Sequence, residues 1–487
     1  MVEEKLAKIV GARNVMRGES ELNDYAKNFS FVNAFRPRCI VKAETAGQIE
    51  KIVKLANDTA TPLVPVSSGP PHFRGDTVPG TGGAVVVDLS GMKKITRVDR
   101  TNRVAMFEPG VTYRELMAAV AKEGMRLNLP LLPRKNKAVV GHLLEREPLV
   151  MPKYHWDIGD PLSCLEIIFG NGEMFRTGAA AGPGSLEDQW AAGGAQKEAA
   201  GPSSASWYRI IQGAQGTMGI VTWASIRCEL LPSLEEPFLI GSDNLDKIME
   251  MVHWLIRLRL VNECFVMNNC DLASIVANKF PEDYQIIKDS LPTWALFCNI
   301  AGYEYLPEKR VSGQIKDMKA AARRAGLETG QALGKVIASE LLAAVQCPSR
   351  EPYWKLRYKG ACHDIFFLSL YDKLPEFIRI MQDAADEAGY PASDLGIYLQ
   401  PVVQGTSCHC EFNLFYDPDN AGDITRVKEL SNSVTRKLLN AGAFFSRPYG
   451  ESAGMIINRD AATAAALKKV KLITDPNNIM NPGKLCF

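Results

Sequence analysis

The sequence predicts an α+β fold with two domains, and three observations lead to this prediction. Residues 1–232 alternate between helical and strand-like segments, and residues 233–450 mix helices and strands without a repeat. A strand-like run ends at Pro232, which marks a boundary between domains. We therefore expect a first domain at 1–232, a second domain at 233–450 and a C-terminal segment at 451–487.

Local patterns place helices and strands in the first half of the first domain. Apolar residues within 45–58 recur at helical spacing, whereas 84–89 is a short apolar run rich in β-branched residues and indicates a buried strand. Residues 104–108 indicate another strand. Thr112 and Glu115 then form a capping-box pattern, which predicts the start of a helix.

The second half of the first domain shows strand and loop signals. Gly170-Asn171-Gly172 separates two strand-like runs and predicts a hairpin over 165–176. Residues 178–206 are rich in Gly, Ala, Pro and Ser, so we expect a long surface excursion rather than a packed element. Strand character returns at 220–231.

The second domain combines helices with strands. Residues 245–258 and 373–388 have helical patterns, and 294–300 indicates a strand. Residues 397–403 also indicate a strand, which Pro401 would place at a sheet edge because proline has no N–H to donate. An Ala-rich helix is expected from Asp460 to about Thr474.

Composition excludes several classes of function. The 487 residues are 46% hydrophobic and 23% charged, as in ordinary globular enzymes. The formal net charge of +1 gives no electrostatic reason to expect nucleic acid, and no apolar run approaches membrane-spanning length. Eleven scattered cysteines and an N-terminus without signal-peptide features indicate reduced thiols in a cytoplasmic protein.

Two common nucleotide-binding motifs are missing. A dinucleotide fingerprint requires G-x-G-x-x-G between a strand and a helix, but the glycines of 80–83 lead into a strand. A phosphate-binding P-loop needs Ser or Thr after its Gly-Lys pair, whereas Gly334-Lys335 is followed by Val336. NAD-binding and P-loop functions are therefore disfavoured.

A different set of motifs occurs in order along almost the whole chain. Residues 65–72 read P-V-S-S-G-P-P-H, 108–113 read E-P-G-V-T-Y, and 141–146 read G-H-L-L-E-R. Residues 216–222 read G-T-M-G-I-V-T, and 475–484 end the series with D-P-N-N-I-M-N-P-G-K. Together these segments resemble the vanillyl-alcohol oxidase / p-cresol methylhydroxylase superfamily of FAD-binding flavoproteins.

The resemblance implies a two-subdomain FAD-binding domain, an α+β substrate (cap) domain, and a C-terminal segment that returns to the FAD domain. FAD is the implied cofactor, because small residues let backbone N–H groups approach its diphosphate. The residues implied to bind it are Val66, Ser67, Ser68, Gly69, Pro70, Pro71, His72, Pro109, Gly141, His142, Glu145, Tyr154, Gly216, Gly219, Ile220, Val221, Asn481 and Lys484.

Attachment of the flavin stays open at this stage. Some relatives tether FAD through a histidine after the glycine loop, and others through a histidine or tyrosine of the cap. His72 lies near the first position, but Pro70 and Pro71 intervene. We favour non-covalent FAD, with His72 as a neutral hydrogen-bonding group beside it.

The resemblance also implies catalytic candidates at the junction of the domains. Relatives carry an acidic residue near flavin N5 at the position of His155, where a histidine can also exchange a proton near neutral pH. Glu145 and Asp157 are the nearest carboxylates that could compensate for the change. The alternative for Glu145 is a structural ion pair with Arg146.

A second group of candidates comes from the cap. His409 and Glu411 would share one face of a strand, with Glu411 orienting a histidine base, unless they form a buried structural pair. Adjacent residues of Cys408–Glu411 point to opposite faces and cannot all reach one ion, so we expect no metal site.

Anion recognition has two candidate positions. Arg447 and Tyr449 could bind a phenolate or carboxylate oxygen. Relatives that oxidise para-alkylphenols use two tyrosines and an arginine, and Phe73 appears where the first tyrosine would stand. Lys355 and Arg357 are alternatives, although structural charges are the commoner role for such residues.

The sequence therefore indicates an FAD-dependent oxidoreductase that transfers hydride from a small organic substrate, an aromatic compound among the candidates, to flavin N5. A 2-hydroxy-acid dehydrogenase and a flavin-carrying electron-transfer subunit remain alternatives. We expect a homo-oligomer with a small-molecule substrate and an unidentified electron acceptor, without a nucleic-acid partner or a membrane span.

Overall fold

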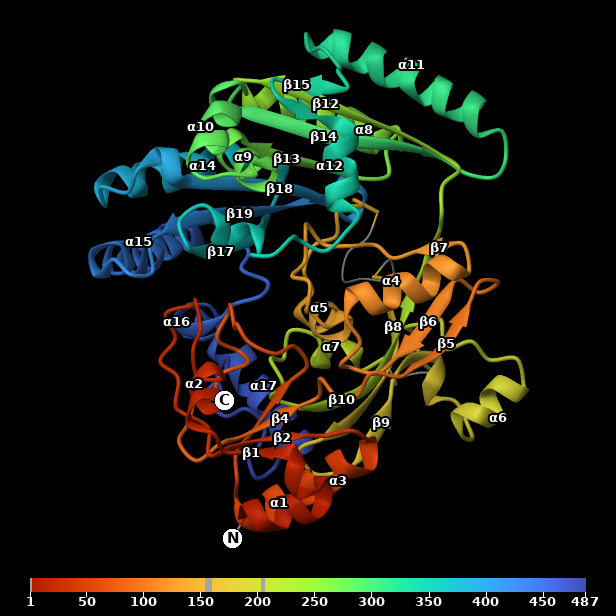
Figure 1. Cartoon of the computed structure of the whole chain (residues 1–487), viewed down its shortest axis with the longest axis vertical. Helices are drawn as coiled ribbons and strands as arrows, with labels where there is room; N and C mark the ends of the chain where they lie inside the picture. Colours follow the sequence, from red (N-terminus) through yellow and green to blue (C-terminus); the bar gives the residue numbers. More distant parts are fainter. Residues whose placement is uncertain (1, 154–159, 203–205) are drawn as a thin grey trace.

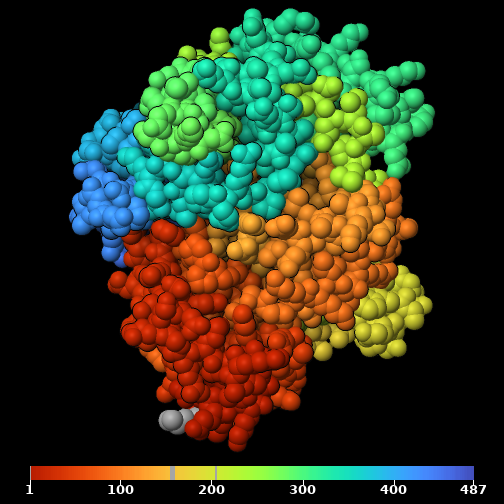
Figure 2. Space-filling model, in the orientation of Figure 1, coloured from red at the N-terminus to blue at the C-terminus, as the bar shows by residue number. Residues whose placement is uncertain are grey.

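The computed structural model describes residues 2–153, 160–202 and 206–487, which form two lobes stacked along the long axis (Figure 1). The lower lobe is the first domain and holds both termini. The upper lobe is the second domain and is built on one six-stranded sheet. The lobes are in direct contact on the face seen in Figure 2. This arrangement confirms the predicted α+β, two-domain fold.

The first sheet of the lower lobe has the order β1-β2-β4-β3, with β2, β4 and β3 parallel. Helix α3 is capped by Thr45, whose side chain accepts a hydrogen bond from Gln48 N, and the helix buries the predicted apolar stripe. The elements are α1 (Val2–Val10), β1 (Val15–Met16), α2 (Glu19–Asp24), β2 (Cys39–Lys42), α3 (Ala46–Thr59), β3 (Leu63–Val66) and β4 (Val85–Asp88).

The second sheet is antiparallel, in the order β5-β6-β10-β8-β9. The capping box of Thr112 and Glu115 and the hairpin of β8 and β9 are both present, as predicted. The elements are β5 (Ile95–Asp99), β6 (Val104–Phe107), α4 (Tyr113–Lys122), β7 (Met125–Arg126), α5 (Val139–Glu145), β8 (Leu162–Phe169), β9 (Met174–Arg176), α7 (Tyr208–Ile211), β10 (Gly219–Arg227) and β11 (Glu229–Leu230).

The expectation of an unpacked excursion over 178–206 is wrong for its first part. Helix α6 (Leu186–Ala191) begins with a capping box of Ser185 and Asp188. Leu186 and Trp190 pack on a small core that contains Trp223. A short helix can form in this Gly- and Ala-rich segment because its cap and two large apolar residues stabilise it.

The upper lobe has an antiparallel sheet in the order β12-β14-β13-β18-β19-β17. Helices α8, α11, α14 and α15 pack on one face, and α9, α10, α12 and α13 on the other. The elements are β12 (Leu234–Ser242), α8 (Leu245–Arg257), β13 (Cys264–Asn268), α9 (Asn269–Val276), α10 (Glu282–Asp289), β14 (Trp294–Gly302), α11 (Pro307–Ala325), β15 (Ala332–Leu333), β16 (Val336–Ile337), α12 (Ala338–Val345), α13 (Trp354–Arg357), β17 (Ala361–Ser369), α14 (Leu374–Glu387), β18 (Leu395–Val402), β19 (Ser407–Tyr416) and α15 (Ala421–Asn440).

The placement of the strand containing Pro401 at a sheet edge is wrong. Strand β18 lies inside the sheet, between β13 and β19. Its pairing with β13 covers only Tyr398 and Leu399, so the N–H that Pro401 lacks is not needed by that neighbour.

The chain returns to the lower lobe through α16 (Gly450–Ile457) and α17 (Ala461–Thr474). Residues after α17 pair with β3, where Leu63 N donates to Ile479 O at 2.7 Å and Asn481 N donates to Leu63 O at 2.8 Å. The C-terminal residues that follow α17 therefore lie beside the start of β3. Every helix in the described ranges is too short or too polar to cross a bilayer.

Candidate active site

Three neighbouring cavities run from the interior of the first domain to the junction with the second. Cavity A lies against Gly141, Gly216 and Val221, and cavity B against His72, Arg74 and Glu145. Cavity C is lined by Phe366, Arg447 and Tyr449, among others. Glu145 lines both A and B, Arg74 lines B and C, and Tyr449 lines A and C. Because each pair of cavities shares a wall residue, the three cavities together form one path.

Two glycines of cavity A, Gly141 and Gly216, pack closely against the residues that precede and begin the loop after β3. A Cβ at Gly141 would lie 2.7 Å from Ser67 Oγ, and one at Gly216 would lie 2.5 Å from Pro65 Cγ. Gly216 also has a φ of 71°, which other residues adopt at a cost. Both glycines also line cavity A, so a ligand in the cavity meets backbone with no side chain at these positions.

The C-terminal turn adds a buried cation beside this cavity. Lys484 is 6% exposed, and its ammonium group has no carboxylate or hydrogen-bond partner in the described part of the chain. Burial lowers its pKa, and nearby Asp76 opposes that shift. Asn481 Nδ2 donates to the carbonyl oxygens of Asp76 and Gln215, both at 2.7 Å, while its buried Oδ1 lacks a partner. An anionic ligand would satisfy Lys484.

Cavity B is enclosed by charged groups. Arg74 Nη1 lies 3.1 Å from Glu145 Oε2 and also pairs with Glu147, and Lys137 pairs with Glu145. Burial raises the pKa of Glu145, against the opposing effect of Lys137. Burial also opposes ionisation of Glu147, but Arg74 and Lys137 hold its pKa well below the usual value. Glu147 is therefore the ionised partner, and Glu145 is the carboxyl closer to protonation.

His72 lines cavity B as a neutral group. Its Nδ1 is 2.8 Å from Thr77 Oγ1, and its buried Nε2 has no partner in the described residues. Burial, and then Arg134 and Lys137, lower the pKa of His72 to about 4. At neutral pH it can donate or accept one hydrogen bond within the cavity.

Cavity C contains a buried arginine without an acidic partner. Arg447 is 5% exposed, and its guanidinium carbon lies 4.3 Å from the ring centre of Phe366. Arg447 Nη1 donates to the backbone oxygen of Glu145 at 3.4 Å, and no carboxylate of residues 2–153, 160–202 and 206–487 pairs with it. Burial and then Arg74 lower its pKa. An anionic group bound here would compensate the buried charge.

Two segments of the chain match known protein families. Residues 37–178 match the FAD binding domain family, and 369–485 match the C-terminal domain of FAD linked oxidases. The chain is an FAD-linked oxidoreductase that carries both of these domains, and its fold is that of p-cresol methylhydroxylase.

Similarity to individual relatives of this flavoprotein is low but extends over the full chain. It is 22% identical to the 4-cresol dehydrogenase (hydroxylating) flavoprotein subunit of Pseudomonas putida, over 99% of this chain and 94% of that protein. It is 21% identical to glycolate oxidase subunit GlcD of Bacillus subtilis, over 99% and 96%. A crystal structure of substrate-bound p-cresol methylhydroxylase superposes with a TM-score of 0.84 at 18% identity, over 99% of this chain and 95% of that one.

The cavities of the flavoprotein fit FAD. Glycine backbone at 141 and 216 offers a close approach, and Lys484 supplies an unpaired buried cation for a diphosphate. Predicted cofactor residues that line cavity A or B are Ser67, Ser68, His72, Pro109, Gly141, Glu145, Gly216, Gly219 and Val221. The other predicted cofactor residues line neither cavity, and they are Val66, Gly69, Pro70, Pro71, His142, Ile220, Asn481 and Lys484.

Two predicted residues, Tyr154 and His155, lie outside the described residues, as does Asp157. His142 is buried behind cavity A, where its Nδ1 contacts the hydroxyl of Tyr113. The alternative of a Glu145–Arg146 pair is replaced by contacts of Glu145 with Arg74 and Lys137.

His409 and Glu411 share a strand face, with Nε2 and Oε2 3.1 Å apart. They lie behind Phe366 and line none of cavities A, B and C. Glu411 also pairs with Lys355 Nζ at 2.7 Å, and Lys355 reaches Asp364 at 2.8 Å. Lys355 therefore has a structural role, and the described residues contain no group of three potential metal ligands.

Sequence reasoning missed several residues of the path, namely Arg74, Lys137, Glu147, Asp364 and Phe366. Arg74 is two residues from His72 in the predicted cofactor loop, which is the one local signal available. Asp364 and Phe366 come from a cap strand that gave no functional signal, and only folding brings them to the loop.

Proposed function

We propose that this flavoprotein oxidises a small organic substrate that carries an anionic oxygen, either a carboxylate or a phenolate. The observation that carries the proposal is Arg447, a buried guanidinium without an acidic partner on the wall of cavity C. Its fork of N–H donors suits an oxyanion. Phe366 stacks under Arg447 and supplies an apolar surface beside the charge.

The substrate would bind next to the cofactor. Tyr449 lines both cavity C and cavity A, so a molecule held by Arg447 lies beside the end of the cofactor cavity. Bound FAD supplies the hydride acceptor. Arg447 and Phe366 orient the substrate, and the closely packed second domain keeps bulk water away from it.

Glu145 is the proposed proton acceptor for a substrate hydroxyl. It lines cavities A and B, and burial raises its pKa toward the range where a carboxyl can take up a proton. His155, at the family's acidic position, remains a further proposal for this role. The pair of His409 and Glu411 would act through Phe366 and the cap strand rather than by direct contact.

Two substrate classes fit Arg447. An aromatic substrate is favoured by Phe73, Phe366 and Tyr449, whose rings lie around cavity C. A 2-hydroxy acid would present the same carboxylate charge, and the similarity to glycolate oxidase subunit GlcD supports it as the second candidate. A flavin electron-transfer subunit is a third possibility from the sequence.

An anaerobic substrate screen tests the proposal. The purified flavoprotein is mixed without oxygen with 4-alkylphenols, aryl-substituted carboxylates and 2-hydroxy acids, and flavin absorbance near 450 nm is followed. We expect bleaching by an anionic substrate and not by its uncharged methyl ester or ether. Bleaching by neutral compounds alone would contradict the role of Arg447, and reduction by a partner protein alone would favour the electron-transfer subunit.

We propose that FAD binds non-covalently, since neutral His72 already contacts Thr77, and that domains divide at 232 and 450. A cytoplasmic location is supported by eleven free cysteines. A homo-oligomer is proposed from the family resemblance, and acid precipitation and sedimentation analysis test attachment and assembly, respectively.

A further inference from the structure

A fourth cavity, cavity D, lies between the two domains on a different side from cavities A, B and C. Its walls come from α4, β7 and residues 127–129 of the first domain, and from Glu235, Glu263 and the end of α12 in the second. It shares no lining residue with the other three cavities. Leu231 and Pro232, where the chain crosses between the domains, also line it.

Cavity D is large enough for a small organic molecule. Its volume is about 170 Å³, compared with about 90 Å³ for cavity A and about 90 Å³ for cavity C. An apolar protein cavity of about 150 Å³ can take up benzene. Most of the wall is apolar, including Met117, Met125, Leu127, Leu129, Val150 and Val345.

One end of cavity D is polar and has an excess of carboxylates. Arg126 Nη1 lies 3.1 Å from Glu235 Oε1 and 3.1 Å from Glu263 Oε1. Gln346 Nε2 also donates to Glu235 Oε1, at 2.9 Å. Two carboxylates therefore share one guanidinium, and Glu235 Oε2 accepts no hydrogen bond from the described residues. The end has a free acceptor and favours positive charge.

The second carboxyl group, that of Glu263, is difficult to ionise unless a cation is nearby. Glu263 is 2% exposed, and burial raises its pKa despite the contact with Arg126. A second cation beside the pair would stabilise the ionised form of Glu263. Arg126 joins β7 of the first domain to both carboxylates of the second, so a ligand here would contact both domains.

We propose that cavity D is a second small-molecule site, distinct from the substrate path, which binds an apolar compound ending in an ammonium group. The aryl or alkyl part fills the apolar wall, and the ammonium donates to Glu235 Oε2. The proposal does not depend on the identity of the substrate. The size of the cavity, its apolar wall and its excess of carboxylates favour such a ligand.

Calorimetric titration of the FAD-loaded protein with benzylamine tests the site. We expect one binding site, with benzoate at least tenfold weaker because its charge is repelled by the two carboxylates. The variant Glu235→Gln should weaken benzylamine about tenfold, as expected for loss of a charged hydrogen bond. Binding of uncharged toluene should change little in that variant.

Two further variants locate the site. Leu129→Trp fills the cavity and should abolish binding of both benzylamine and toluene, and Val345→Phe is a milder filling change in case the first variant folds poorly. Arg447→Gln, in cavity C, should leave benzylamine binding unchanged even where it removes turnover. Equal binding of benzoate and benzylamine, loss of binding in Arg447→Gln, or no binding at millimolar benzylamine would each overturn the proposal.

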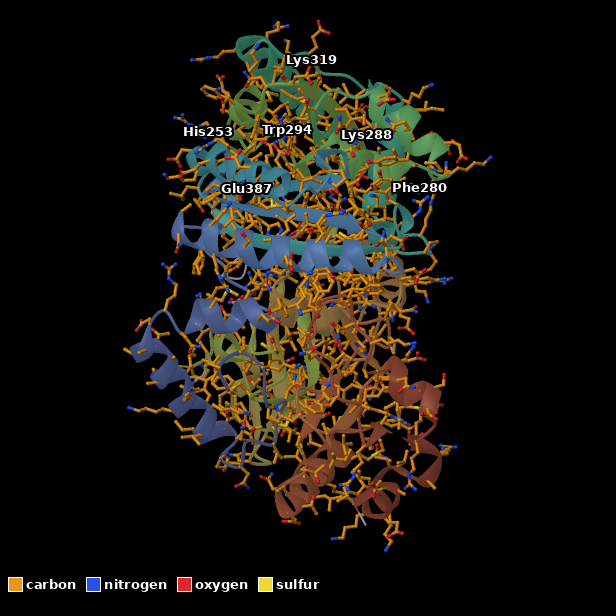
Figure 3. The ribbon with its side chains drawn as sticks, turned by 90° about the vertical axis from the view of Figure 1, so that its left-hand side faces the viewer. His253, Phe280, Lys288, Trp294, Lys319 and Glu387 are labelled. Carbon is orange, nitrogen blue, oxygen red and sulfur yellow. The ribbon has the colours of Figure 1, made fainter. Side chains whose placement is uncertain are left out.

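The cap positions shown in Figure 3 provide controls far from this site. His253 and Lys288 lie in the upper lobe, away from the first domain. The side chain of His253 is exposed on α8, so His253→Gln should leave benzylamine affinity within twofold of the unaltered protein. A larger change in this control would show that binding occurs elsewhere on the cap.

Discussion

Arg74 and Glu145 form an ion pair, with Nη1 and Oε2 3.1 Å apart, which joins the loop after β3 to the end of α5. The same guanidinium lies 4.9 Å from the ring centre of Phe366 on cap strand β17. Arg74 thus connects three segments that lie far apart in the sequence. It holds Glu145, the proposed proton acceptor, at the boundary of cavities A and B.

Replacement of Glu145 tests that role. We expect Glu145→Gln to lower kcat about 100-fold or more, because it removes the acceptor while keeping the shape. A carboxyl acts as a base only above its pKa, so kcat/KM should rise with pH through a pKa above the usual glutamate value and lose that limb in the variant. Stopped-flow flavin reduction across pH 4–8 measures both. Glu187→Gln, on exposed α6, should match the unaltered protein.

Replacement of Arg447 tests anion recognition. Arg447→Gln should raise KM for an anionic substrate about 30- to 100-fold, the effect of a lost charged hydrogen-bonded pair. Arg447→Lys should recover only part of this loss, because lysine lacks the planar fork. Bound FAD should stay stoichiometric, and exposed Arg379→Gln is the matched control. A selective loss of FAD would instead place Arg447 in the cofactor site.

Replacement of Lys484 tests the cofactor site. Lys484→Met keeps the length of the side chain but removes the buried charge, and we expect FAD affinity to fall about tenfold or more. Fluorescence titration of apoprotein with FAD measures the change. Riboflavin has no diphosphate, so its affinity should be unaffected. Lys469 is exposed on α17, and Lys469→Met is a matched control for which FAD affinity should not change.

Replacement of Lys355 tests the buried cluster of the cap. Lys355→Met leaves the carboxylates of Asp364 and Glu411 without their shared cation, at a cost of about 3 to 5 kcal/mol in free energy of unfolding. Urea denaturation at pH 7 measures the loss. Lys373→Met breaks only an exposed pair with Glu376 and should cost less than about 1 kcal/mol. Equal losses would show that the buried cluster contributes no special stability.

Asp271 is expected to make the stability of the folded protein vary with pH. Burial raises its pKa to about 7, and Oδ2 accepts a hydrogen bond from Asn413 Nδ2 at 2.8 Å. A carboxyl with a raised folded-state pKa favours folding below its unfolded pKa of about 3.9, and this contribution is lost as pH rises through 7. Asp271→Asn should therefore raise Tm at pH 8 more than at pH 5. A constant difference at both pH values would contradict this account.

Many local elements of the fold could be predicted because their signals lie within a few residues. Thr112 and Glu115 cap α4, and a tight turn at 170–172 with two glycines connects β8 to β9. The failures occurred where neighbours in space decided the outcome. Pro401 is tolerated inside the sheet because the pairing of β18 with β13 covers only Tyr398 and Leu399, and α6 forms because Trp190 packs on a small core.

The residues of the candidate site also divide into those with a local sequence signal and those that only folding brings together. Ser67, Gly141 and Gly216 were expected at the cofactor site from recognisable small-residue segments, and all three line cavity A. The role of Arg74 was not, because a charged side chain in a loop has no local feature that separates a surface position from a buried one. His409 could be paired with Glu411 from strand periodicity, but its distance from the cavities could not be predicted.

The sequence by itself determined the class of fold, the FAD family and the small-residue segments, since each depends on contacts between residues close along the chain or on ordered motifs. Only the tertiary structure decided which charges meet. Whether Arg447 lacks a carboxylate, or Arg126 has two, depends on side chains that come from different domains. Coulomb interactions depend on distance in space and on burial, and neither is encoded by separation along the chain.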